Sequence, residues 1–239
     1  MVQLREPRQY SMNGTTPLSV RRTFDNWLWI AAALSFGISL TRWGPLVLYP
    51  FRLFSTWVHE CGHAVMTILV GGHVSSIVIE RTGAGVTRSL MPHSRVAQAL
   101  VASAGYLGAS VVGCALMIAA RGKKQSHTIL WTIGAFMLVT LIIWMRNLFG
   151  IAVVLIWSAA LIALSRRASG RVSAFVLSLL AVQVALNSVF DIRVLFLVNG
   201  GHSDAATMAG LFLLPAWIWA ALWMLISVSL LTWTLLRTR

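Results

Sequence analysis

Residues 46–70, LVLYPFRLFSTWVHECGHAVMTILV, decide the fold class of this chain of 239 residues. The segment is predominantly apolar, and as a helix that rises about 1.5 Å per residue it is long enough to cross a hydrocarbon core of about 30 Å. Its second half nevertheless contains His59, Glu60 and His63. A charged side chain inside a membrane span costs about 2.5–3.5 kcal/mol on insertion scales. The segment therefore predicts a membrane helix whose polar residues are kept for a purpose.

The composition of the whole chain supports a membrane location. Apolar residues make up 58% and charged residues 10%, against about 25% charged residues in an ordinary soluble domain. These values exclude a soluble globular domain and a disordered chain. Nineteen Lys and Arg face six Asp and Glu, for a formal net charge of +13. The basic residues are scattered between apolar runs, which favours contact with the lipid bilayer and argues against nucleic acid as a partner.

The apolar runs predict an all-α polytopic membrane protein with six to seven transmembrane helices. The first run is short for a span, and the others are long enough. We expect a polar N-terminal tail at 1–26 and a single membrane-embedded domain at 27–239. The runs are 27–41, 46–70, 95–120, 128–145, 148–164, 172–190 and 211–236.

A short β-hairpin is predicted between the second and third runs. Residues 74–79 and 86–90 are rich in β-branched and apolar side chains, and they flank the turn sequence of residues 82–85, TGAG. Such a backbone needs water or a protein-lined cavity at membrane depth. The hairpin either offers an edge to an extended substrate segment or simply connects two helices.

The orientation in the membrane depends on the first run. If all seven runs cross, Lys and Arg divide ten against nine between the two sides, whereas they divide fourteen against five if run 27–41 does not cross. The positive-inside rule favours the second division. We therefore interpret run 27–41 as a surface or partial helix.

The sequence His59-Glu60-Cys61-Gly62-His63 carries the chemistry. Two histidines at i and i+4 lie on one face of a helix, where both imidazoles can bind one metal ion. Zn²⁺ lowers the pKa of a bound water to about 7, and Glu60 is then placed to accept its proton as general base. The alternative is a polar cluster that joins helices or lines a channel.

A catalytic zinc site needs a third protein ligand. We favour Asp191, because it ends run 172–190, where the helix macrodipole disfavours an acid that has only a structural role. Asn187 lies one turn earlier on the same face and is a weaker candidate for orienting the substrate or stabilising an oxyanion. Asp204 is the alternative ligand, although its place after Ser203 also fits a first-turn acid of the last helical segment.

The chain resembles the site-2 protease family of intramembrane zinc metalloproteases, in particular a compact bacterial branch. The likeness rests on HExxH in an apolar helix, on Gly71-Gly72-His73-Val74 with the following hairpin, and on Ala104-Gly105-Tyr106-Leu107-Gly108. It implies zinc bound by His59 and His63, Glu60 as general base, and an Asp ligand on a later helix. The family's Asn-x-x-Pro-x-x-x-Leu-Asp-Gly motif is replaced here by residues 187–191, NSVFD.

We therefore predict an intramembrane zinc metalloendopeptidase of the inner membrane of a bacterial cell. It would hydrolyse peptide bonds in or near transmembrane segments of other membrane proteins. The first alternative is a non-catalytic membrane protein with a structural or sensing metal site. A transporter is the second alternative, and the scarcity of ionisable residues in the other runs argues against it.

Overall fold

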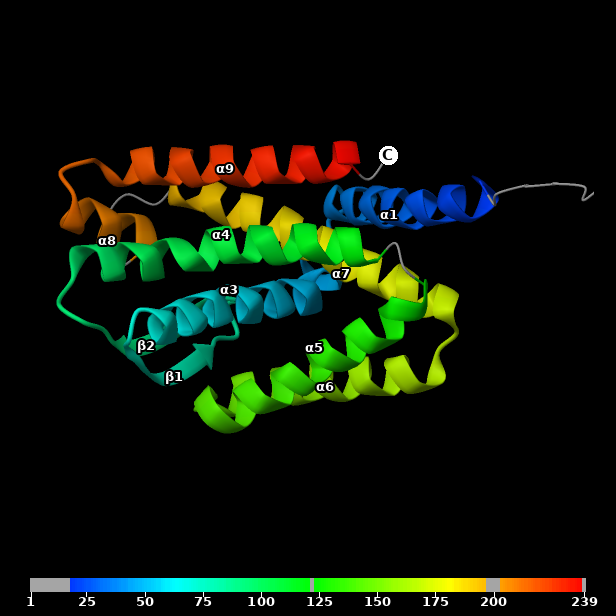
Figure 1. Ribbon diagram of the computed structural model, residues 1–239, viewed down its shortest axis with the longest axis horizontal. Coiled ribbons are helices and arrows are strands. Elements are labelled where there is room, and N and C mark those ends of the chain that lie inside the picture. The colour runs from blue at the N-terminus through cyan, green and yellow to red at the C-terminus, as the bar shows by residue number, and fades with distance from the viewer. Residues whose placement is uncertain (1–17, 121–122, 197–202, 238–239) are drawn as a thin grey trace, which may run out of the picture.

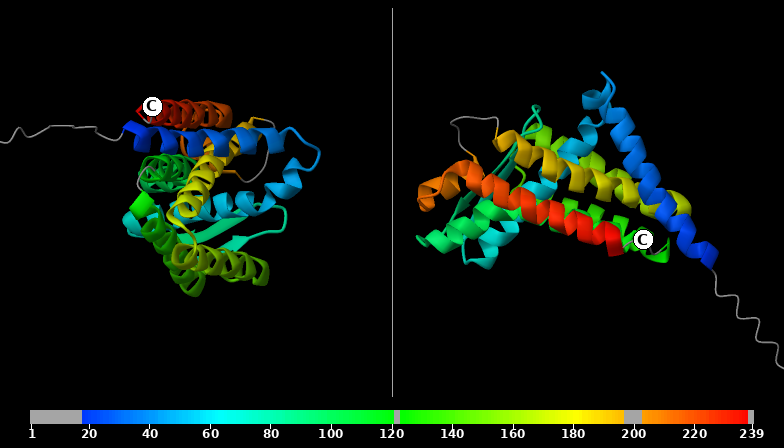
Figure 2. Two further views of the ribbon diagram at one scale, coloured as in Figure 1. Left: turned by 90° about the vertical axis from the view of Figure 1, so that its right-hand side faces the viewer. Right: turned by 90° about the horizontal axis from the view of Figure 1, so that it is seen from above.

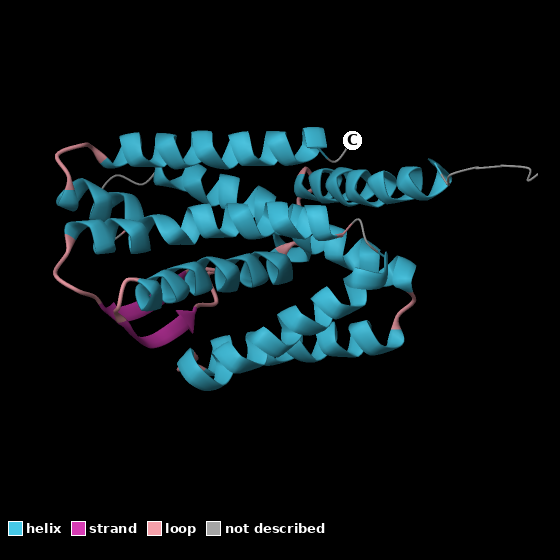
Figure 3. Cartoon of the chain, viewed as in Figure 1, coloured by secondary structure: helices cyan, strands magenta, loops and turns pink. Residues whose placement is uncertain are grey.

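The computed structural model describes residues 18–120, 123–196 and 203–237, and it consists of helices and one two-stranded sheet (Figures 1 and 3). The predicted tail falls largely on residues outside the described part, although helix α1 already begins at Leu18. In chain order the elements are α1 (Leu18–Ser39), α2 (Gly44–Val47), α3 (Tyr49–Leu69), β1 (His73–Ile79), β2 (Gly85–Leu90), α4 (Arg95–Ala119), α5 (Lys123–Trp144), α6 (Leu148–Arg167), α7 (Gly170–Leu195), α8 (Asp204–Leu211) and α9 (Ala216–Arg237).

Five of these helices, α4, α5, α6, α7 and α9, are long and apolar enough to cross a membrane. This confirms the predicted all-α polytopic class. Helix α3 has 21 residues and is thus as long as these spans, but its central polar residues lower its mean hydropathy. The apolar part of α1, Trp27–Ser39, is shorter, and its position as a surface or partial helix stays a prediction.

The helices form two groups that enclose α3 (Figures 1 and 2). Helix α4 packs against α3, α7 and α9, and α5 pairs with α6 along their whole length. Helix α7 crosses behind the bundle and contacts α1, α3, α4, α5 and α9. The core between these layers contains fully buried side chains such as Phe54, Leu177 and Trp223. The central position of α3 explains why a helix with charged residues is retained in an otherwise apolar bundle.

Strands β1 and β2 form the predicted antiparallel hairpin between α3 and α4. Gly83 adopts φ +85° in the turn, a conformation that side-chain-bearing residues rarely adopt. The outer edge of β1 is covered by the α5–α6 turn: Ile77 forms a bridge with Met145, and the Asn147 side chain bonds both the N–H (3.3 Å) and the C=O (2.7 Å) of Ile79. Strand β2 has β1 as its only strand neighbour in the described sheet.

A buried cluster of serines joins three helices of the larger group. The Ser110 hydroxyl of α4 lies 2.8 Å from the Ser188 hydroxyl of α7 and 2.7 Å from that of Ser227 of α9. Hydroxyls that bond across helices stabilise membrane bundles because lipid offers them no partner. The cluster therefore fixes α9, and with it the preceding helix α8, against α4.

Candidate metal centre

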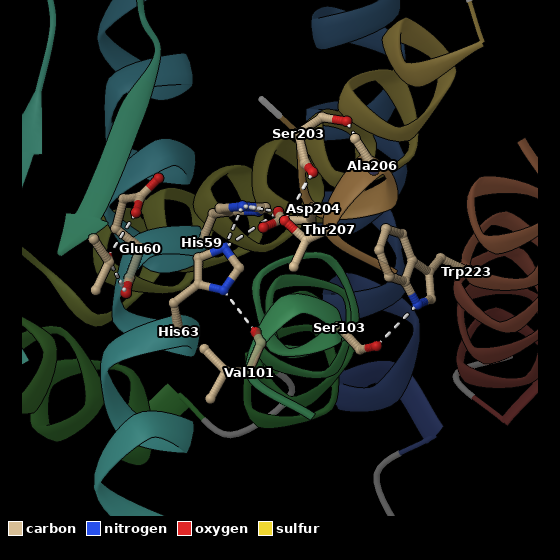
Figure 4. Close-up of polar contacts among 11 residues, drawn as sticks. His59, Glu60, His63, Val101, Ser103, Ser203, Asp204, Ala206, Thr207 and Trp223 are labelled. Carbon is tan, nitrogen blue, oxygen red and sulfur yellow. Dashed lines mark hydrogen bonds and ion pairs between the residues drawn. The ribbon is translucent and has the colours of Figure 1, made fainter. Parts of the chain in front are cut away.

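The two histidines of α3 face the same direction, as their spacing predicts. Pro50 lies in the first turn of α3, where a proline loses no helical hydrogen bond, and the helix then continues unbroken through the motif. His59 Nε2 and His63 Nε2 lie 3.0 Å apart. Figure 4 shows both rings converging on one point between α3 and α8.

The orientation of His63 is fixed by the backbone of α4. Its Nδ1 lies 2.7 Å from the carbonyl oxygen of Val101. Because a carbonyl oxygen only accepts, Nδ1 carries the hydrogen, and the lone pair of the neutral ring is on Nε2. This arrangement is the usual support for a metal-binding histidine.

Asp204 completes the group from the other end of the sequence (Figure 4). Its Oδ2 lies 3.5 Å from His59 Nε2 and 3.3 Å from His63 Nε2. The residue begins α8, and the Ser203 hydroxyl caps this helix by accepting a bond from the Ala206 N–H. Burial alone would raise the pKa of the Asp204 carboxyl. When no metal is bound and the histidines are protonated, their hydrogen bonds and charges outweigh burial and hold that pKa well below its usual range.

The structure thus brings Asp204, and not the favoured Asp191, into contact with the histidines. Asp191 lines the same cavity, but among the described residues the only group of three or more potential ligands close enough to share an ion is His59, His63 and Asp204. Asp204 is also the first-turn acid that its sequence position indicated. Asp204 can be a first-turn acid and also face the histidines, because the Ser203 cap fixes the start of α8 and this start carries the Asp204 carboxylate.

The donor set fits a tetrahedral zinc ion. The three ligand atoms lie within 4.8 Å of one another, with separations of 3.0, 3.3 and 3.5 Å. Bonds of about 2.0–2.1 Å in a tetrahedral arrangement place neighbouring ligand atoms about 3.3 Å apart. Two imidazoles and one carboxylate form a three-ligand set typical of catalytic zinc sites, which leave a fourth position open.

Glu60 turns from the helix toward the hairpin rather than toward the histidines (Figure 4). Its Oε2 accepts a hydrogen bond of 2.6 Å from the Thr87 hydroxyl of β2, which also lies 3.0 Å from the Glu60 carbonyl. Gly85 lies so close that a Cβ at this position would be 2.5 Å from Glu60 Oε1. The hairpin therefore holds the carboxylate of a residue that is only 4% exposed.

Two glycines allow α4 to approach the histidines. A Cβ on Gly105 would lie 2.5 Å from His63 Nε2 and would also overlap His59 Nε2. A Cβ on Gly62 would overlap the carbonyl of Ala104. The structure places Gly105 directly against the ligand nitrogens.

A cavity of about 520 Å³ adjoins the group and is large enough for water and a peptide segment. Its walls come from α3, β2, the start of α4, the end of α7 and α8. Besides the histidines and Glu60 it is lined by Arg52, Thr87, Tyr106, Asp191 and Asp204, among others.

The remaining sequence-derived candidate, Asn187, lies away from this cavity. It is not among the residues lining the cavity walls, and within the described part of the chain its buried Nδ2 has no hydrogen-bond partner. Its role in orienting the substrate stays a prediction. Conversely, Thr87 and Gly85 contact Glu60, but sequence reasoning did not single them out as site residues, because only the docking of the hairpin on α3 reveals these contacts.

A family model described as peptidase M50B-like matches residues 29–234, nearly the whole membrane domain. The chain belongs to the peptidase M50B-like family. This membership confirms the resemblance to site-2 proteases and identifies an integral membrane protein of an intramembrane metalloprotease family. Comparison with curated proteins gives no match. Comparison with solved structures gives none either.

Proposed function

We propose that this protein is an intramembrane zinc endopeptidase that cleaves other membrane proteins in or near their transmembrane segments. The observation that carries the proposal is the group of His59, His63 and Asp204 beside Glu60 in one water-accessible cavity. The five apolar spans favour a substrate that reaches the site within the bilayer. We place the protein in the inner membrane of a bacterial cell.

Each residue of the site has a defined task in this proposal. His59, His63 and Asp204 hold the zinc ion, which when bound supplies Lewis acidity that polarises the scissile carbonyl and acidifies water. Glu60 accepts the proton of the attacking water and then donates it to the leaving amine. Thr87 keeps the Glu60 carboxylate on the hairpin side of the cavity through its hydrogen bond.

The hairpin provides a place for the substrate backbone. Four residues of β2, Gly85, Val86, Thr87 and Ser89, line the cavity, whereas the outer edge of β1 is already occupied by the α5–α6 turn. A transmembrane segment that unwinds into an extended strand can pair with β2 and so place its backbone beside Glu60. This supports the interpretation of the hairpin as a substrate edge over that of a simple connector.

The activity test compares three forms of the protein in proteoliposomes with a fluorescently labelled membrane-protein substrate. We expect wild type to release a cleaved fragment, and we expect Glu60→Gln and His59→Ala to release essentially none. Glu60→Gln should retain zinc, because Glu60 is not a ligand in this proposal. Cleavage by Glu60→Gln at the wild-type rate would overturn the mechanism. Zinc binding without cleavage of any substrate would favour a structural or sensing site.

Metal analysis decides the third ligand. Asp204→Ala should lose zinc after purification, whereas Asp191→Ala should retain it, because only the Asp204 carboxylate contacts both histidines. The two variants remove the same chemical group from the same cavity and are therefore matched. Zinc loss in Asp191→Ala with full occupancy in Asp204→Ala would reverse the assignment.

A further inference from the structure

We propose that the outer face of the α5–α6 pair binds an anionic phospholipid, with its phosphate at Arg166 and Arg167 and one acyl chain in a groove along α6. The groove has a volume of about 390 Å³, and none of the residues that line it lines the cavity at the metal centre. The inference does not depend on peptidase activity. It rests on the shape of the groove, on its charge and on its place in the membrane.

The groove is apolar along its length. Leu155, Ala159 and Ile162 follow at i, i+4 and i+7 and form one face of α6, with Leu138 of α5 opposite them. The only hydroxyl in the wall, that of Ser158, donates a bond of 2.8 Å to the Gly134 carbonyl and is thus satisfied internally. The small side chains of Ser158, Ala159 and Ala163, beside the larger leucine and isoleucine side chains, leave a groove that suits a hydrocarbon chain.

The groove faces lipid rather than another part of the protein. Helices α5 and α6 both qualify as membrane spans, and only 28% and 33% of their span residues are buried. From Leu155 to Arg166 the helix rises about 16 Å, close to half of a hydrocarbon core of about 30 Å. The groove therefore extends from one membrane surface to the bilayer centre, which is the depth of one leaflet.

Two cations stand at the outer end of the groove. Arg166 and Arg167 line it, are exposed, and form no ion pair with any acid in the described part of the chain. The acidic side chains that the structure describes, Glu60, Glu80, Asp191 and Asp204, belong to the hairpin or to the metal-site cavity. The guanidinium groups are therefore free to bind a phosphate in the plane of the lipid headgroups.

The test measures lipid binding to the purified full chain in detergent by native mass spectrometry and by thermal unfolding. Phosphatidylglycerol and phosphatidylcholine with identical acyl chains are compared, with inorganic phosphate as a third ligand. We expect wild type to bind phosphatidylglycerol preferentially and to gain melting temperature with it. The double variant Arg166→Gln/Arg167→Gln should lose about 10- to 30-fold in affinity for this lipid, since each arginine contributes about one factor of five.

Two further variants separate charge from groove shape. Arg171→Gln/Arg237→Gln removes two exposed arginines, at the start of α7 and the end of α9, that do not line the groove, and it should bind like wild type. Ala163→Phe fills the groove and should weaken binding although both arginines remain.

An equal loss of phosphatidylglycerol affinity in both double variants would show that binding depends only on the net charge of the protein, and it would overturn the proposed site. Stabilisation by inorganic phosphate alone would show an anion site without a lipid. A change in oligomeric state in Ala163→Phe with unchanged lipid preference would assign the groove to a second copy of the chain.

Discussion

The side chain of Glu60 depends on a single hydroxyl for its position. Thr87 donates a bond of 2.6 Å to its carboxylate, and the backbone of Gly85 closes the other side. A carboxylate that serves as general base has to be held within reach of water and substrate, because proton transfer depends on geometry before it depends on pKa. Thr87 is therefore a positioning residue for Glu60 in the proposed reaction.

Replacing Thr87 by valine keeps the shape of the side chain but removes the donor. Hydrogen bonds to charged groups contribute about 1.5–3 kcal/mol, so we expect kcat for substrate cleavage to fall about 10- to 100-fold with unchanged zinc content. Thr87→Ser should restore most of the activity because it restores the donor. Thr82→Val is the matched control, since among the described residues its hydroxyl bonds only Glu80 and the turn backbone at the exposed hairpin tip. Full activity of Thr87→Val would show that Glu60 does not need this contact.

Gly105 is the second residue on which the metal site depends. A methyl group there would overlap the ligand nitrogens of both histidines, and alanine would otherwise favour the helical conformation by about 1 kcal/mol over glycine. We expect Gly105→Ala to reduce zinc affinity at least about tenfold, because the added methyl group would displace the histidine rings and changes that disturb the orientation of metal ligands typically cost about 10- to 100-fold in affinity. Competition with a fluorescent zinc chelator measures this. Gly108→Ala, whose Cβ would meet only Gly62 Cα at 3.6 Å, should bind zinc like wild type.

At the scale of elements, the hairpin is held in place by the α5–α6 turn. The Asn147 side chain accepts a hydrogen bond from the Ile79 N–H and donates one to the Ile79 carbonyl, as the backbone of a neighbouring strand would. This contact fixes β1, and through the ladder between the strands it fixes the position of β2 beside α3. The free edge of β2 can then face the cavity while the other edge of the sheet is protected.

We expect Asn147→Ala to lower the free energy of unfolding by about 1–3 kcal/mol, the sum of the two hydrogen bonds between the Asn147 side chain and the Ile79 backbone. Substrate cleavage should slow because the edge of β2 is no longer fixed, whereas zinc content should stay normal. Thermal unfolding and metal analysis check this. Thr132→Ala is the control, because its exposed hydroxyl bonds only its own helix. A normal melting temperature for Asn147→Ala would mean that the two bonds contribute nothing to the hairpin.

The elements themselves follow from local sequence patterns. Apolar runs predict the spans, and the turn sequence with its flanking β-branched residues predicts the hairpin within one or two residues of β1 and β2. The spacing of His59 and His63 predicts their shared face because that depends on one helix alone. The choice between Asp191 and Asp204 depends on how α8 returns to α3, which no local pattern contains. The contact of Thr87 with Glu60 likewise depends on how the hairpin packs against α3, which the local sequence does not predict.

At the scale of the whole molecule, the metal group joins distant parts of the chain. His59 and His63 belong to α3 at the centre of the bundle, whereas Asp204 belongs to α8 at its end. Helix α8 packs against α4 and α9, and α9 is anchored on α4 by the cluster of Ser110 with Ser227. An ion bound by the three residues would thus form a cross-link between the His helix and the α8–α9 unit.

Removing the metal should therefore loosen α8 more than the rest of the bundle. A ligand present at 100 times its Kd stabilises the folded state by about 2.7 kcal/mol, so chelation of the zinc-loaded protein should lower its melting temperature by several degrees. Amide hydrogen exchange should accelerate in residues 203–211 but not in the α5–α6 pair, none of whose described residues lines the cavity at the metal centre. In Asp204→Ala the chelator should change neither quantity. Uniform acceleration across all helices would show instead that the ion supports the global fold rather than the docking of α8.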